Sequence, residues 1–214
     1  MNANAEPKVA PGDVAAFESL MRRWNRRLFR IARSVLRNDE EAEDALQEAY
    51  LRAYRSLDQF QGDAQLSTWL SRVVLNECFA RLRKQARRQN VIPLVSNEDE
   101  MHTHVPEDPG HAPDRALARA ELRALLERKL DALPEDFRVV FVLRSVEEMS
   151  VEEAAACLDI PAATVRSRHF RARSLLRESL ARDIDVAERD LFDFLGERCD
   201  RIVAAVLARL HEAP

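Results

Sequence analysis

The segment from Ser150 to Leu176 constrains the fold most, because it reads as a helix, a tight turn and a second, basic helix. Ser150 and Glu153 have the spacing of a capping box, in which both side chains bond backbone groups at a helix start. Pro161 interrupts the pattern, and it suits the first turn of a following helix. The second helix carries basic side chains at Arg166, Arg168, His169, Arg171 and Arg173. This pattern predicts a helix-turn-helix that fits the DNA major groove; the alternative is an amphipathic helix with a solvated basic face.

The composition favours an all-α chain. Of the 214 residues only 4 are glycine, while Ala, Leu, Arg and Glu are abundant. The net charge of −4 argues against a protein that coats DNA without specificity. The charges are nevertheless segregated, with a basic block over residues 22–37 and an acidic block over residues 39–48. Such blocks indicate separate surfaces for a nucleic acid and for a basic protein, although a pair of solvated helices explains the charges equally well.

Several classes of protein are disfavoured. The cysteines Cys78, Cys157 and Cys199 lie far apart, which predicts reduced thiols in a cytoplasmic protein. The first twelve residues lack the apolar core of a signal peptide, and no apolar run has the length of a membrane span, so we expect no membrane insertion. We find no phosphate loop, no nucleophile with a base and no metal-ligand spacing. We therefore expect no enzyme activity, no metal and no cofactor.

Four segments follow one another along the chain. Residues 13–88 are predicted to form a first helical domain, with helices that begin near Val14, Ala42 and Ser67 and a break at Asn38-Asp39. Residues 89–113, rich in proline and acids, are predicted to form a flexible linker. Its histidines (His102, His104 and His111) could bind a metal or simply be solvated. Residues 114–182 are predicted to form a second domain of four helices.

Two parts of this division leave alternatives open. Glu135 to Val146 is predicted as a helix, although Val139 to Leu143 could equally form a short buried strand. The tail, residues 183–214, has an apolar stripe at helical spacing. It is predicted to be a helix that either packs on one of the domains or acts as a docking or regulatory helix.

Three segments, in this order, resemble the extracytoplasmic-function (group IV) sigma factors of bacterial RNA polymerase. They are Asp44 to Tyr54, then Phe60 to Asp63 with Ser67 to Leu70 and Asn76, and finally Thr164 to Arg173. The resemblance covers about residues 14–180. It implies a factor that binds core RNA polymerase, recognises the minus-ten and minus-thirty-five promoter elements and helps to open the duplex. It also implies an inhibitory anti-sigma protein as a partner.

The resemblance also assigns roles to residues of the first domain. Core-polymerase binding falls on Asp44, Gln47, Glu48 and Leu51, with a purely structural core role as the alternative for Leu51. Phe60 and Asn76 are expected to hold a flipped base of the minus-ten element, since single-stranded bases are read by stacking and by hydrogen bonds to their edges. Arg81, Arg83 and Lys84 are expected to contact phosphates. Trp69 could stack on a second base, but its apolar neighbours favour a core position.

In the second domain, the resemblance implies that the minus-thirty-five element is read in the major groove by Arg166, Ser167, Phe170 and Arg171. Arg168 and Arg173 are expected to hold phosphates. His169 and Phe170 belong to the same minus-thirty-five set and differ between members of such families, so the resemblance leaves open which bases are read. Asp159 stands where the turn of this motif usually has glycine, which would cost strain at a positive φ. The tail lies outside the family pattern.

Two other functions would use a similar chain. A free-standing helix-turn-helix regulator would bind duplex DNA tightly on its own, which the negative net charge and the single basic helix disfavour. A protein–protein adaptor would leave the basic helix solvated. Loss of promoter-specific transcription in Arg166→Ala would favour DNA reading over the adaptor.

Overall fold

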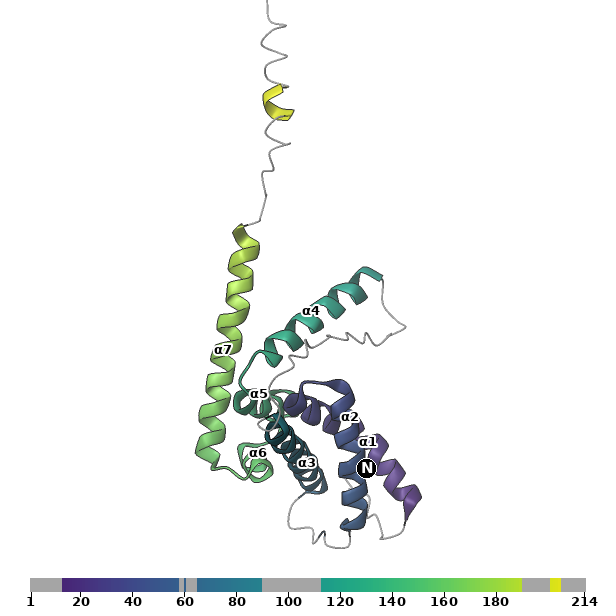
Figure 1. Ribbon diagram of the computed structural model, residues 1–214. Coiled ribbons are helices and arrows are strands. Elements are labelled where there is room, and N and C mark those ends of the chain that lie inside the picture. Colours follow the sequence, from purple (N-terminus) through teal and green to yellow (C-terminus); the bar gives the residue numbers. More distant parts are fainter. Residues whose placement is uncertain (1–12, 58–59, 61–64, 90–112, 190–200, 205–214) are drawn as a thin grey trace, which may run out of the picture. The chain divides into compact units, whose positions relative to one another are not determined.

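The computed structural model describes residues 13–57, 60, 65–89, 113–189 and 201–204 (Figure 1). Every regular element named in these residues is a helix, which confirms the all-α prediction. The chain forms two compact units, Met1–Leu176 and Arg177–Pro214. The helices are α1 (Val14–Leu36), α2 (Asp39–Arg55), α3 (Leu66–Gln89), α4 (Pro113–Asp131), α5 (Glu135–Phe141), η2 (Val142–Val146), α6 (Val151–Leu158) and α7 (Ala162–Arg189).

Helices α1, α2 and α3 pack against one another in pairs. The Asp13 side chain caps α1 by accepting from the Ala16 amide at 2.9 Å, and α1 ends at Arg37, whose φ is 59°. The Asn38 side chain accepts from the amide of Glu41 at 2.8 Å, so the predicted break is a cap and α2 begins directly after it. Along these helices the apolar positions point inward, and Leu20, Leu28 and Ile31 are fully buried.

The second group of helices, from α4 to α7, contains the helix-turn-helix, which is formed by α6 and α7. The capping box is present: the Ser150 amide donates to Glu153 at 2.7 Å, and the Glu153 amide donates to Ser150 Oγ at 3.0 Å. Asp159 has φ 54° and ψ 46°, the left-handed conformation that glycine adopts at less cost. Pro161 immediately precedes α7, and its carbonyl accepts from the Thr164 amide at 2.9 Å. The proline thus stands one residue earlier than its expected place in the first turn.

Residues Val139 to Leu143 are helical, so the strand alternative is wrong. Helix α5 continues directly into η2, a five-residue π-helix whose wider turns follow no pattern that we recognised in the sequence. The inward side chains of this stretch include Val139, Val140 and Leu143, all at most 2% exposed. The continuous apolar run from Val139 to Leu143 therefore belongs to a helical stretch that is buried over a wide part of its surface.

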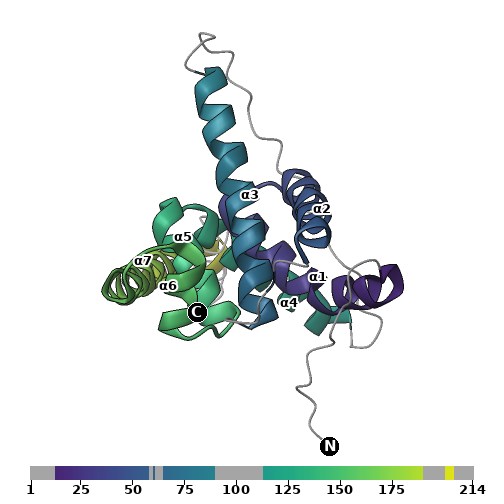
Figure 2. The ribbon, with the colours of Figure 1, turned by 90° about the horizontal axis from the view of Figure 1, so that it is seen from below.

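The two groups of helices share a core within the first unit. Helix α3 contacts α6, and α1 contacts both α5 and η2. Figure 2 shows α5 and α6 on the side of α3 opposite to α2. One buried cluster joins side chains of α1, α2 and α3 to Val139, Val140, Leu143, Met149 and Cys157, among others. The linker from residue 90 to 112, with its three histidines, lies outside the described residues, as does most of the tail.

Candidate protein and nucleic-acid interfaces

The outer face of α2 displays the residues expected to bind polymerase. Asp44, Gln47 and Leu51 are exposed, and Glu48 is half-buried, while Ala45 and Ala49 on the other face lie in the core. The Leu51 side chain is 51% exposed, so the alternative core role for this residue is wrong. Helix α2 therefore presents one apolar anchor among acidic and polar side chains.

A buried carboxylate that the sequence analysis did not single out connects this face to α3. Glu77 is 5% exposed, and its carboxylate accepts from Arg81 Nε at 2.9 Å and lies 2.8 Å from Arg52 Nη2. Arg52 lies 3.8 Å from Glu48, and Arg81 donates to the backbone carbonyl of Asp44 at 3.0 Å. The sequence did contain a signal for the Glu77–Arg81 pair, because side chains four residues apart on a helix are neighbours. Arg81, expected to contact phosphate, is therefore engaged between α2 and α3.

The other minus-ten candidates differ in exposure. Phe60 is half-buried and its ring lies 5.4 Å from that of Trp69, centroid to centroid, while Asn76 is exposed on α3. Trp69 packs against the core, as the sequence favoured. Arg83 and Lys84 are exposed about two helical turns beyond Asn76. Neither takes part in the contacts that hold Arg81 between α2 and α3.

On α7 the candidate residues divide between an outward and an inward face. Arg166, Ser167, Phe170, Arg171 and Arg173 are exposed, and Phe170 at 74% is the most exposed large apolar side chain among the described residues. Arg166 lies 3.4 Å from Glu152 on the preceding helix. A phenyl ring so exposed between arginines suits contact with thymine methyls and base edges.

Arg168 and His169 face the helices behind α7. Arg168 forms a 2.7 Å ion pair with Asp136, and His169 Nε2 lies 2.8 Å from Ser145 Oγ. Burial, together with the charges of Arg144 and Arg173, lowers the pKa of His169, which favours the neutral imidazole. These two residues attach α7 to α5 and η2, and the exposed side chains beside them form the outer face.

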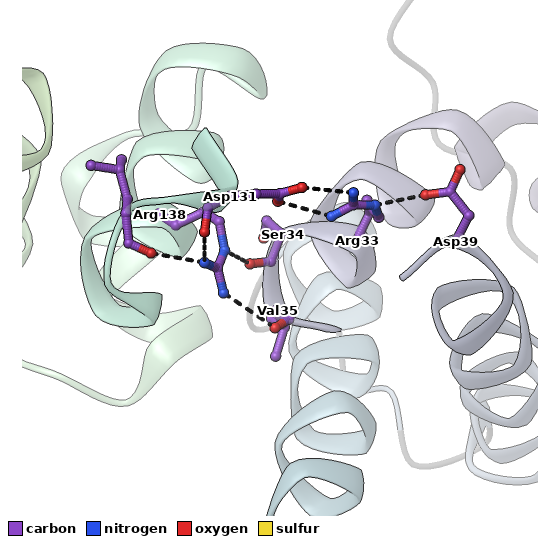
Figure 3. A network of polar contacts seen from close by, with 7 residues as sticks. Arg33, Ser34, Val35, Asp39, Asp131 and Arg138 are labelled. Carbon is purple, nitrogen blue, oxygen red and sulfur yellow. Dashed lines mark hydrogen bonds and ion pairs between the residues drawn. The ribbon is translucent and has the colours of Figure 1, made fainter. Parts of the chain in front are cut away.

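A polar network crosses from α1 to the second group of helices (Figure 3). Arg33 donates two hydrogen bonds to Asp131, at 2.9 and 2.8 Å, and one to Asp39 at 2.6 Å. Burial alone would lower the pKa of Arg33, but Asp131 and Asp39 outweigh it and the pKa is raised. Arg138 is 4% exposed and donates to the backbone carbonyls of Ser34, Val35, Asp131 and Leu133.

A second ion-pair cluster lies further along α1. The Glu147 carboxylate accepts from Arg30 at 2.6 and 3.1 Å, and it also lies 3.7 Å from Arg27. Its side chain is only 3% exposed. Several arginines of the basic block that the sequence showed therefore face acids of the second group of helices.

The part of the chain that the structure describes holds no group of His, Cys, Asp or Glu side chains arranged to bind a metal ion. Its helices include none that is long and apolar enough to cross a membrane.

Comparison with known proteins identifies the class of these helices. Residues 20–88 match the model of sigma-70 region 2, and residues 123–176 match that of sigma-70 region 4. The chain is 33% identical to RNA polymerase sigma-H factor of Pseudomonas aeruginosa over 81% of its length and 90% of the relative's. It is 35% identical to the ECF RNA polymerase sigma-E factor of Escherichia coli, over 79% and 88%.

Solved structures agree with this class. The sigma factor RpoE of Bartonella quintana, in complex with the anti-sigma factor NepR, has a TM-score of 0.63 at 25% identity, over 78% of this chain and 98% of that one. CnrH in complex with the cytosolic domain of CnrY has a TM-score of 0.55 at 28% identity, over 80% and 92%. The chain belongs to the extracytoplasmic-function sigma factors, which confirms the resemblance. It directs promoter-specific transcription initiation, and the free-standing regulator is not favoured.

Proposed function

We propose that three exposed faces divide the work of initiation. The outer face of α2 binds core RNA polymerase, α3 with Phe60 captures the minus-ten element, and the outer face of α7 reads the minus-thirty-five element. The observation that supports this division most directly is the exposure of Leu51 on α2 and of Phe170 on α7, two large apolar side chains on helices that bury other apolar residues such as Leu46 and Val165. Exposed apolar anchors rimmed by charge are typical of recognition surfaces.

The polymerase face can be tested with Leu51→Ala. Because half of this side chain is exposed, we expect the free energy of unfolding to change by less than about 0.5 kcal/mol, whereas loss of an interface anchor costs about 1–2 kcal/mol, or roughly tenfold in Kd for core polymerase. Leu122→Ala on α4 is the matched control, because Leu122 is 56% exposed. Equal affinities of the two variants would contradict the assignment. Glu48→Lys should weaken the same complex by charge reversal.

The minus-thirty-five face can be tested by comparing two arginines of one helix. Arg166→Ala should lose roughly 1–3 kcal/mol of discrimination at one base pair, since Arg166 is exposed and an arginine can bind guanine in bidentate fashion. Arg168→Ala should lower stability through the lost pair with Asp136 and leave base preference unchanged. Transcription from a pool of promoter fragments by core polymerase measures both. If Arg168→Ala changed the base preference and Arg166→Ala did not, the proposed assignment of the outward face of α7 to DNA would be wrong.

The minus-ten face can be tested with duplex and premelted templates. Asn76→Ala should impair initiation on both templates, since a captured base is bound after it leaves the stack. Arg83→Ala and Lys84→Ala should each weaken DNA binding uniformly and lower the salt dependence by about one counterion. A base-specific effect of either basic variant would argue against phosphate contact.

The remaining expectations complete the proposal. Both solved relatives are complexes, one with the anti-sigma factor NepR and one with the cytosolic domain of CnrY, which supports an anti-sigma protein as a partner of this chain. The role assigned here requires binding, and no chemistry by the chain itself, so we propose that it is not an enzyme. Its place of action would be the cytoplasm, with polymerase and promoter DNA.

A further inference from the structure

We propose that Glu77 is a positioning residue for the polymerase-binding face of α2. Its carboxylate holds Arg52 away from Glu48, and so keeps the Glu48 carboxylate available to a basic partner. The Glu77 side chain is only 6% exposed on α3, so it acts through Arg52 rather than by touching polymerase. The effect on polymerase affinity rests on the proposed function, whereas the competition of the two carboxylates for Arg52 does not.

Arg52 lies between two carboxylates and is engaged by only one of them. Its Nη2 atom forms a 2.8 Å ion pair with Glu77 Oε2, whereas its Nε atom lies 3.8 Å from Glu48 Oε1. The first distance is that of a close, charge-assisted contact, and the second is beyond hydrogen-bond reach. Glu48 therefore feels the arginine but is not bound by it.

The local sequence by itself favours the other pair. Glu48 precedes Arg52 by four residues on α2, which is the favourable spacing and order for a salt bridge within one helix. Burial explains why Arg52 is drawn to α3 instead. The Glu48 side chain is 41% exposed and is solvated without a partner, whereas a buried carboxylate such as that of Glu77 is costly to leave unpaired. The arginine thus lies with the carboxylate that water cannot reach.

Arg81 holds the Glu77 carboxylate in place beside α2. Its guanidinium donates to Glu77 at 2.9 Å and to the backbone carbonyl of Asp44 at 3.0 Å. In an α-helix that carbonyl also accepts from the amide four residues further on, which is the amide of Glu48. Arg81 therefore ties α3 to the turn of α2 that carries Glu48. This contact keeps Glu77 within reach of Arg52.

A free Glu48 matters because of the partner that the face is proposed to bind. Asp44 and Glu48 are the two acids of this face, and a basic partner is attracted by carboxylates whose acceptor sites and charge are not already used. If Arg52 closed on Glu48, the partner would have to displace an arginine of the same helix. By holding Arg52, Glu77 removes that competitor before polymerase arrives.

Glu77→Gln in the full chain tests the proposal, since glutamine keeps the shape of the side chain and removes its charge. Arg52 should then close on Glu48, and the Kd for core polymerase should rise about threefold to tenfold. Glu147→Gln is the matched control, because Glu147 is also a buried carboxylate that faces two arginines, Arg27 and Arg30, and it lies outside α2. It should not raise the Kd. An unchanged Kd in Glu77→Gln, or an equal rise in Glu147→Gln, would overturn the proposal.

A second substitution separates positioning from a structural role. When Arg52→Gln is added to Glu77→Gln, no arginine remains to close on Glu48, and the Kd should return to within about twofold of the wild-type value. A fold weakened by loss of Glu77 would not recover when a further polar partner is removed. Adding Arg81→Gln instead leaves Arg52 in place and should restore nothing. Recovery with Arg81→Gln, or none with Arg52→Gln, would contradict the proposed role.

The competition can be measured without polymerase. Urea denaturation of Glu48→Gln, Arg52→Gln and the double variant gives the coupling between these two side chains. The coupling should be negligible while Glu77 is present, and in a Glu77→Gln background it should appear as about a twofold change in the unfolding equilibrium constant. Equal coupling in both backgrounds would overturn the competition. If Glu48→Gln leaves the Kd for polymerase unchanged, the proposed polymerase face is wrong, and the urea result decides the competition independently.

Discussion

Region 2, formed by α1 to α3, and region 4, formed by the helices from α4 to the first half of α7, bury their apolar side chains in different ways. In region 2, three long helices of at least 17 residues pack pairwise and enclose Leu20, Leu28, Ile31 and Leu75 without exposure. In region 4, α5, η2 and α6 have at most 8 residues each, and most of their fully buried side chains belong to the same buried cluster as the core of region 2. Long helices can form a core by packing against one another, whereas short helices need another element to pack against. Region 4 should therefore depend on region 2 more than the reverse.

The largest expected effect comes from a cavity in region 2. Leu75→Ala should lower the free energy of unfolding by about 3 kcal/mol, because Leu75 is fully buried and the cavity cannot collapse completely. Urea denaturation measures this, with Leu117→Ala as a control at a 61% exposed leucine. Amide hydrogen exchange in α6 should accelerate together with that in α3 if region 4 depends on region 2. Unchanged exchange in α6 would show that the two regions are energetically separate.

Removal of Arg138 should come next. Arg138→Ala leaves the carbonyls of Ser34, Val35 and Leu133 without their donor, which should cost about 2–3 kcal/mol. Arg138→Met should cost less than Arg138→Ala, because both variants lose the buried charge and the hydrogen bonds but only methionine fills the space. The difference between the two variants in thermal denaturation separates packing from polar satisfaction. Equal losses would mean that packing has no share in the effect.

The capping box of α6 should have a smaller, pH-dependent effect. Glu153→Gln should lose about 1 kcal/mol at pH 7. Hydrogen bonds from Ser150 lower the pKa of Glu153, so the folded state favours the carboxylate. This contribution is complete above the ordinary pKa of glutamate and disappears as the pH falls through the lowered value. The stability of the variant and of the wild type should therefore converge in acid, and a constant difference down to pH 3 would contradict this origin.

The smallest effect is expected at an exposed pair of region 2. Arg22 and Glu18 form a 2.7 Å ion pair with both side chains more than half exposed. Arg22→Ala should change the free energy of unfolding by at most about 0.5 kcal/mol, and less at high salt. A loss above 1 kcal/mol in 0.5 M NaCl would be inconsistent with a screened surface pair.

The sequence predicted local structure well, because helix caps and turns are determined by residues that are close together in the chain. The cap at Asn38, the capping box at Ser150 and the positive φ at Asp159 each depend on a few neighbouring residues. Hydrophobic spacing placed the helices to within a few residues. The π-helical turns of η2 were not predicted, because the local residue pattern does not distinguish them from an ordinary α-helix.

The direction of charged side chains was harder to predict. Arg81, Arg168 and Arg173 read alike in the sequence, yet the first pairs with Glu77, the second with Asp136, and the third is exposed. An arginine suits a phosphate and a carboxylate equally, and only the fold decides which is within reach. For the same reason the contacts of Arg33 and Arg138 between regions 2 and 4 could not be found without coordinates.

The shared capping of α1 has a consequence for synthesis. Arg138 follows Ser34 by 104 residues in the chain. At 5–20 residues per second, a ribosome needs about 5–20 s to make that interval. A nascent region 2 therefore folds first and presents the last carbonyls of α1 to water until region 4 emerges. During those seconds the growing polypeptide already displays the α2 face that we propose binds polymerase, so its first encounter with polymerase can precede completion of its own C-terminal half.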